Sequence, residues 1–268
     1  RVSNALGAGE YNSNIPITDI YGNIRIDSFE GNYQSIDIGA IEFPLDSIEY
    51  KNWFVSFNGN DNNNGENPNL PFKHINYAVS KALNGDRIYV QNGTYNENIL
   101  FNGKNVKLMN KRYYDDGQIS ECGFIEDSFI EDLIIEPLNN TPVIQILEGE
   151  NNIELCGFTI TDGEANYGSG IFINNANPTI HSINIVNNYS LVDGGGLYGD
   201  NFNGQLHNIK IIGNISAGNG AGIFLNNSSP SLKNILISEN MNRVTNYNLN
   251  GGGMYLSNSN ISNMEYVT

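Results

Sequence analysis

The chain has few basic residues, few prolines and only two cysteines. Its 13 Lys and Arg face 29 Asp and Glu, a net charge of −16, which excludes the broad basic face that binds nucleic acid. Cys122 and Cys156 are too few for a disulfide-held scaffold, and the sequence does not decide whether they pair. No apolar run approaches the roughly 18 residues of a membrane span. The 268 residues suffice for one sizeable core or two modules.

Asparagine and glycine are present in excess. The sequence contains 48 Asn and 29 Gly among its 268 residues. Both residue types adopt turn and left-handed backbone conformations readily. The composition therefore predicts a chain with many tight corners.

The second half of the chain repeats with a period of about 26 residues. Glycine-rich strand starts end at Gly170, Gly196, Gly222 and Gly253, at intervals of 26, 26 and 31 residues. Asparagines recur in step, as Asn175, Asn201, Asn227 and as Asn188, Asn214, Asn240. An apolar pattern keeps the same period: Ile130/Leu133/Ile135, Leu155/Phe158/Ile160, Ile180/Ile183/Ile185, Leu206/Ile209/Ile211, Leu232/Ile235/Ile237 and Ile261/Met264/Tyr266. Three features at one period predict a solenoid.

Two kinds of solenoid fit this period. The apolar spacing followed by Asn matches the leucine-rich-repeat template. However, the rest of each repeat has no helical periodicity and holds a second short β-like run instead, such as residues 171–173 or 223–225. Two or three short strands per turn, joined by Asn and Gly corners, favour an all-β parallel β-helix, with a leucine-rich repeat as the alternative.

A different segment precedes the repeats. Apolar residues with helical spacing predict a short amphipathic helix that covers the open end of the core, followed by a strand at 87–90. The helical stripe comprises Ile75, Ala78, Val79, Ala82 and Leu83.

This segment resembles the opening of secreted bacterial right-handed parallel β-helix proteins of the pectate-lyase-like superfamily. The matching residues are Trp53–Ser56, Gly59–Asp61, Gly65, Pro71–Lys73, Ile75, Ala78, Gly85–Val90, Gly93–Tyr95 and Glu97. Residues 1–45 are similar to the closing segment of such a module. The resemblance implies three parts: a closing segment of a preceding module (1–45), an opening and cap (46–110) and coils (111–268). It also implies an extracellular or cell-surface location, with flanking modules in a longer chain. Because no capping segment follows the last coil, we expect the native protein to continue beyond Thr268.

Candidate binding residues lie at the position after the first apolar residue of each coil, which should point outward. This position holds Cys156, His181, His207, Lys233 and Ser262, and Lys210 should share the same face. The column can be a polar ladder for sugar hydroxyls or carboxylates, a zinc site that lacks a third ligand, or a solvated face.

Two loops carry further candidates. Asp61, Asn63 and Glu66 alternate around a glycine, as ligands of Ca²⁺ do, although a plain Asn/Gly turn explains the same residues. The loop from Asn240 to Gly253 is five residues longer than its equivalents and holds Arg243 and Tyr247, which suit contact with a sugar.

Three functions remain open. The first is a non-catalytic module that contacts glycans or other surfaces through the candidate residues named above. The second is a lyase or hydrolase of an acidic polysaccharide, dependent on Ca²⁺, with Lys210 and Lys233 as candidate catalytic cations. The third is a structural stalk.

Overall fold

The computed structural model describes residues 9–10, 27–28, 34–36, 50–117, 127–243 and 250–268. The chain forms two compact units, Arg1–Tyr50 and Lys51–Thr268. In the first unit, β1 (Gly9–Glu10), β3 (Gln34–Ile36) and β2 (Asp27–Ser28) form an antiparallel sheet in that order. Whether residues 1–45 close a preceding module stays a prediction.

The second unit is a solenoid of three sheets whose strands all pair in parallel. The long sheet has ten strands: β4 (Asn52–Val55), β5 (Arg87–Val90), β6 (Gly93–Asn96), β8 (Lys107–Asn110), β9 (Leu133–Glu136), β11 (Glu154–Thr161), β14 (Thr179–Val186), β17 (Gln205–Ile212), β20 (Ser231–Ser238) and β23 (Asn263–Val267). The six-stranded sheet contains β7 (Ile99–Leu100), β10 (Ile144–Ile146), β13 (Ile171–Asn174), β16 (Leu197–Asp200), β19 (Ile223–Asn226) and β22 (Met254–Ser257). The four-stranded sheet contains β12 (Glu164–Tyr167), β15 (Tyr189–Asp193), β18 (Ile215–Ser216) and β21 (Met241–Asn242).

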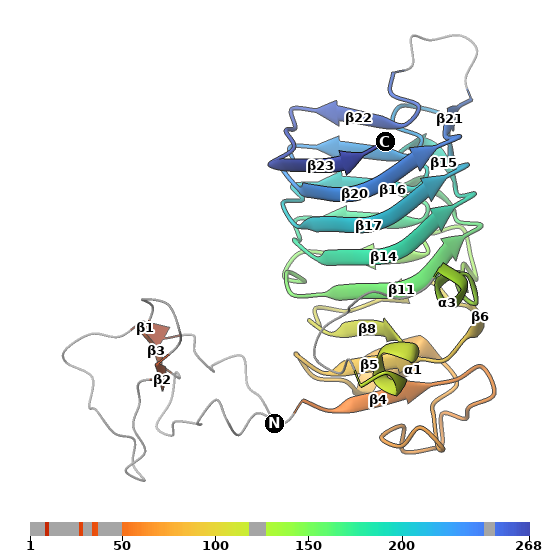
Figure 1. The fold of residues 1–268 in the computed structure, drawn as a ribbon, viewed down its shortest axis with the longest axis vertical. Helices are drawn as coiled ribbons and strands as arrows, with labels where there is room; N and C mark the ends of the chain where they lie inside the picture. Colours follow the sequence, from red (N-terminus) through yellow and green to blue (C-terminus); the bar gives the residue numbers. More distant parts are fainter. Residues whose placement is uncertain (1–8, 11–26, 29–33, 37–49, 118–126, 244–249) are drawn as a thin grey trace. The chain divides into compact units, whose positions relative to one another are not determined.

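From β11 onward, each coil passes through the long, the four-stranded and the six-stranded sheet in turn. In Figure 1 the front strands run to the right and the rear strands return to the left as the chain climbs, which is a right-handed turn. The helices of the described chain, α1 (Ile75–Lys81), α2 (Arg112–Asp115) and α3 (Asp127–Glu131), all precede the coils that begin at Leu133. The prediction of a right-handed parallel β-helix is therefore confirmed, and the leucine-rich-repeat alternative is wrong. No helix of the described residues is long and apolar enough to cross a membrane.

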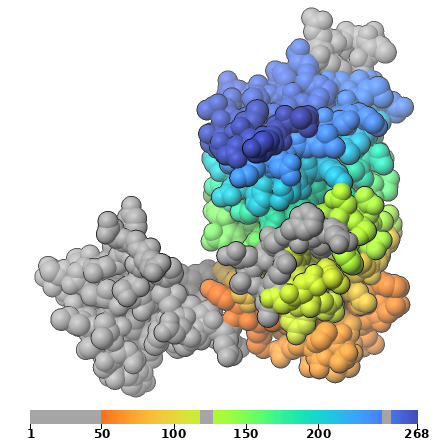
Figure 2. All heavy atoms as spheres, in the orientation of Figure 1, coloured from red at the N-terminus to blue at the C-terminus, as the bar shows by residue number. Residues whose placement is uncertain are grey.

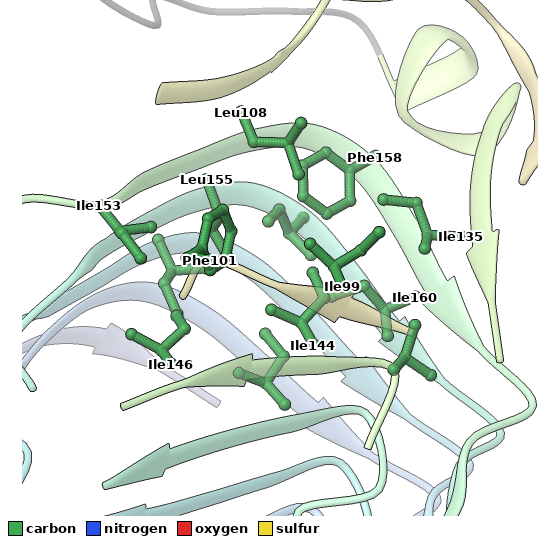
Figure 3. Packing of buried hydrophobic residues seen from close by; sticks show 14 of the residues in the cluster. Ile99, Phe101, Leu108, Ile135, Ile144, Ile146, Ile153, Leu155, Phe158 and Ile160 are labelled. Carbon is green, nitrogen blue, oxygen red and sulfur yellow. The ribbon is translucent and has the colours of Figure 1, made fainter. Parts of the chain in front are cut away.

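Branched side chains fill the core in files that follow the axis. Ile183, Ile209 and Ile235 are paired in register and almost fully buried. Figure 3 shows the same inward packing at the N-terminal end of the solenoid, where Leu155 and Phe158 meet side chains of the opposite sheet. Burying one such side chain contributes about 2 kcal/mol to the free energy of folding. Each added coil therefore adds to the stability of the core.

Asparagines form the corners, for two different reasons. Asn175, Asn201 and Asn227 have positive φ angles of 52°, 51° and 47°, a conformation that Asn tolerates better than most residues. Asn188 and Asn214 instead have fully buried side chains. The Oδ1 atom of Asn214 accepts two hydrogen bonds of 3.0 Å from Asn188, and its Nδ2 donates 2.9 Å bonds to Ile185 O and Asn240 Oδ1. Amide side chains thus satisfy backbone groups that the turn leaves unpaired.

Three details of the sequence prediction are wrong. Ile130, assigned to the first apolar file of the coils, lies in α3, and Leu108 of β8 occupies the rung beside Leu155. The helix α1 ends at Lys81, so Leu83 lies outside the buried stripe and is 44% exposed, whereas Ile75, Ala78 and Val79 are buried. In the last coil, Met264 pairs with Leu232 and Val267 with Ile235, so the pattern Ile261/Met264/Tyr266 is misplaced by three residues. The loop before Gly253 is five residues longer than its equivalents, as the interval of 31 between the glycines indicated. The corner before β23 is longer by one further residue, since Leu232 and its partner Met264 are 32 residues apart.

The Asn214 ladder gives a stability prediction. Replacing Asn214 by Ala leaves at least two buried donors of Asn188 and the carbonyl of Ile185 without this partner, so we expect a loss of about 3 kcal/mol in the free energy of unfolding. Asn166→Ala, at an exposed position in β12, is the matched control and should change stability by less than about 0.5 kcal/mol. Urea unfolding followed by circular dichroism measures both. Equal effects of the two substitutions would contradict a structural role for the ladder.

Candidate functional site

A column of left-handed residues bends the long sheet. Gly157, Ser182, Asn208 and Asn234 have φ angles of 84°, 51°, 55° and 52°, and they lie on adjacent strands. Each inserts one residue into the in-out alternation, which explains why the apolar pattern has a spacing of three and then two. As a result, side chains on both sides of the column point outward, and a hollow runs between the two outward rows.

One outward row continues through the whole long sheet. Strand register places Phe54, Tyr89, Met109, Cys156, His181, His207, Lys233 and Glu265 on consecutive rungs. The first four pack with Tyr113 of α2 and Ile130 of α3 into a second buried cluster. Cys156 is disulfide-bonded; the other cysteine, Cys122, lies outside the described residues. The row is therefore apolar and covered at the N-terminal end, and polar toward the C-terminal end.

His181, which belongs to this row, forms a partly buried polar contact with Glu154. His181 is 3% exposed, and its Nε2 atom lies 3.3 Å from Glu154 Oε1. Lys107 Nζ lies 2.6 Å from the other carboxylate oxygen. Burial raises the pKa of Glu154, but the hydrogen bonds from His181 and Lys107 outweigh burial and hold the pKa at about 2. The solvated-face interpretation is wrong for His181, because this side chain is almost fully buried between its contacts with Glu154 and His207.

His207 stacks directly on His181. The ring centroids are 4.7 Å apart and the planes differ by 3°. Burial, followed by the nearby His181, lowers the pKa of His207 to about 4. His207 is therefore neutral at pH 7, where it can both donate and accept a hydrogen bond.

Two hollows adjoin on this face of the coils, which is turned toward the viewer in Figure 2. One, of about 330 Å³, is lined by Gln205, Leu206, His207, Asn208, Ser231 and Lys233. The other, of about 220 Å³, shares Asn208 and is lined also by Ser182, Asn184, Lys210, Asn234, Leu236, Asp127, Thr268, Ile130, Ile209 and Ile235. We call this pair of hollows the coil groove. It brings together the predicted residues His207, Lys210 and Lys233, while His181 lies beside it.

Both lysines of the coil groove are paired with carboxylates. Lys210 Nζ lies 2.7 Å from Asp127 Oδ2 of α3, and Lys233 Nζ lies 3.1 Å from Glu265 Oε2. All four side chains are at least one-third exposed, so each pair is a weak, exchangeable contact. A carboxylate of a ligand can replace either partner.

Other predicted residues lie elsewhere. Ser262 does not join the outward row, because Glu265 occupies the rung beside Lys233. Arg243 follows β21 in the four-stranded sheet and is exposed, and Tyr247 lies outside the described residues.

Each of the three candidate calcium ligands has a partner within the protein. Asp61 binds the backbone N–H groups of Lys73 and His74 and the His74 ring. Asn63 donates a 2.8 Å hydrogen bond to Pro71 O, and Glu66 pairs with Lys51. In the described part of the chain, no group of three His, Cys, Asp or Glu side chains is placed to hold a metal ion.

An aromatic column on the six-stranded sheet was not anticipated. Phe172, Tyr198, Phe224 and Tyr255 stack at centroid distances of 5.5, 5.1 and 5.3 Å. Each follows the glycine-rich strand start by two residues, so the repeat itself carried the signal. Because the rings stack on one another, the column presents mainly ring edges to solvent.

Comparison with known proteins supplies only distant structural likeness. No protein-family model and no curated protein matches the chain. Solved structures with partial likeness include pectin methylesterase PemA from Erwinia chrysanthemi (12% identity, 72% of this chain and 67% of that one, TM-score 0.39). Others are a pectin methylesterase in complex with hexasaccharide VII (12%, 82% and 81%, 0.41) and pectate lyase Pel9A (14%, 76% and 58%, 0.34). The β-helix of this chain is shown by its own strand register.

The shifted groups predict acid sensitivity in two steps. His207 has a folded pKa of about 4, below its ordinary value of 6.5, so its contribution to stability is complete above pH 6.5 and declines as the pH falls toward 4. Glu154 has a folded pKa of about 2, below 4.5, so its contribution declines between pH 4.5 and 2. Denaturant unfolding at a series of pH values should show that His207→Gln flattens the first step and Glu154→Gln the second. A His207→Gln curve parallel to wild type between pH 6.5 and 4 would contradict this assignment.

Proposed function

We propose that the chain is a secreted or cell-surface β-helix module that binds glycans in the coil groove without cleaving them. The supporting observation is the composition of the groove: amides, hydroxyls, a neutral histidine and two lysines on three adjacent strands, β14, β17 and β20. Hydroxyl groups of sugars need both donors and acceptors, which amides and a neutral imidazole supply.

The lysines favour a glycan that carries carboxylates. They lie on neighbouring strands, β17 and β20, and each is already balanced by a carboxylate that a ligand can displace. The net charge of −16 opposes the approach of an anionic polymer at low salt, so affinity must come from these local contacts rather than from long-range attraction.

An extracellular location agrees with the disulfide of Cys156, because disulfides persist in oxidising compartments. Cys156 itself lies in the buried cluster with Tyr113 of α2 and Ile130 of α3. Flanking modules of a longer chain remain part of this proposal.

Binding is tested by titrating the protein with uronic-acid hexasaccharides and with uncharged hexasaccharides by calorimetry. Lys210→Met and Lys233→Met should each weaken the binding of the acidic ligand about 5- to 10-fold, through the loss of one charge-assisted contact. Lys73→Met, an exposed lysine remote in sequence from the groove strands, is the matched control and should leave binding unchanged. Equal affinity of all four proteins, or no binding of any acidic ligand, would contradict the proposal.

Cleavage is the competing function, and the ion pairs argue against it. Elimination from a uronate needs a base that removes a proton and a cation that neutralises the sugar carboxylate. Both groove amines are paired with a carboxylate, so a uronate must first displace Asp127 or Glu265 before an amine can neutralise its charge. We therefore expect no ultraviolet absorbance from unsaturated products when pectate, alginate or chondroitin is incubated with the protein and Ca²⁺. Activity that disappears in Lys210→Ala or Lys233→Ala would establish a lyase instead.

A further inference from the structure

A separate hollow lies near the cap, between residues of the long and the six-stranded sheet. It has a volume of about 560 Å³ and is formed where α1, β6 and β7 meet the segment before β10. Its apolar surface comes from Leu100 and Leu138, which are 37% and 74% exposed. Its remaining lining consists of His74, Asn76, Asn96, Glu97, Asn98, Asn139, Thr141 and Gln145. We call it the cap pocket.

Hydrogen bonds fix the shape of the cap pocket. Asn98 Oδ1 accepts bonds from Leu138 N and Asn139 N at 2.9 and 3.0 Å, and its Nδ2 donates to Thr141 O and Pro142 O. This single amide holds the segment that carries Leu138. Because the exposed leucine is held by backbone contacts, the apolar surface exists before any ligand arrives.

The polar side chains of the cap pocket that remain available to a ligand are uncharged. Both oxygens of Glu97 already accept bonds, from Ile75 N at 2.7 Å and from Asn76 N at 2.9 Å, and His74 is paired with Asp61. No Lys or Arg lines the pocket. In contrast, the side-chain amides of Asn96 and Gln145 make no hydrogen bond within the described residues, so they can bind hydroxyl groups.

The pocket leads into the aromatic column. Leu100, Gln145 and Phe172 occupy consecutive rungs of the six-stranded sheet, which are about 4.8 Å apart. One face of Phe172 is covered by Tyr198. The other face is turned toward the rung of Gln145, and no described ring stacks on it.

We propose that the cap pocket binds an uncharged oligosaccharide. One sugar lies with its C–H face on Leu100 and Leu138, with its hydroxyl groups bound by Asn96 and Gln145, and the next sugar meets the edge of the Phe172 ring. A charged ligand is disfavoured because the pocket has no free group to balance it. This site is independent of the coil groove and selects ligands of different charge.

The test is calorimetric titration of the whole chain with uncharged hexasaccharides of glucose, mannose, xylose and galactose. At least one should bind, and Leu138→Ala and Gln145→Ala should each weaken it about fivefold or more. Leu138 is so exposed that its replacement leaves the fold intact. Leu191→Ala, which removes a leucine of 49% exposure from β15, is the matched control and should have no effect. Lys210→Met should also have no effect, which separates this site from the coil groove.

Three results would overturn the proposal. The first is that none of the four ligands binds, whatever acidic ligands do in the coil groove. The second is that Leu138→Ala and Leu191→Ala behave alike. The third is that Lys210→Met abolishes the binding of the uncharged ligand, since the ligand would then occupy the coil groove.

Discussion

Parallel register between successive coils is the constraint on which the rest of this molecule depends. From β11 to β20, every strand of the long sheet pairs residue for residue with the strand before it. A slip of one residue would turn the isoleucine files outward and would separate Asn188, Asn214 and Asn240, whose amides bond to one another only in register. Because the register is fixed, surface residues are also arranged in columns, and any site on this fold is a column or the space between two.

The coil groove shows how a local backbone cost produces such a space. A left-handed residue costs roughly 1 kcal/mol for most side chains and less for Gly or Asn. Gly157, Asn208 and Asn234 supply these types, and Ser182 completes the column. The bend directs rows on both sides outward and leaves Asn208 and Asn234 at the bottom, joined by a 2.8 Å bond. The abundance of Asn therefore serves three purposes: buried amide ladders, exposed corners and the floor of the groove.

Sequence periodicity was sufficient for the architecture because the constraint is itself periodic. The glycine intervals, the apolar pattern and the two Asn sets identified the fold, and they placed His181, His207 and Lys233 in one column. The sequence did not predict features that have no equivalent residue one repeat away. The cover over Cys156 comes from residues of α2 and α3, the last coil breaks the period, and Asp127 reaches Lys210 across 83 residues of sequence. The cap pocket lies before the regular repeats, so the repeat pattern did not predict a role for Leu100 and Leu138.

The sheets also differ in charge, which gives the solenoid two chemically distinct faces. The described strands of the four- and six-stranded sheets contain no Lys, Arg or His, whereas the long sheet carries Lys210, Lys233 and both coil histidines. Because each coil adds one rung to both faces, a long ligand that follows the axis gains one set of contacts per coil. Weak contacts on neighbouring rungs then reinforce one another. Once one part of the ligand is bound, the next part is held at a high effective concentration near the next rung. A solenoid with shallow hollows and exchangeable ion pairs can therefore hold a polymer that it would bind poorly as a single sugar.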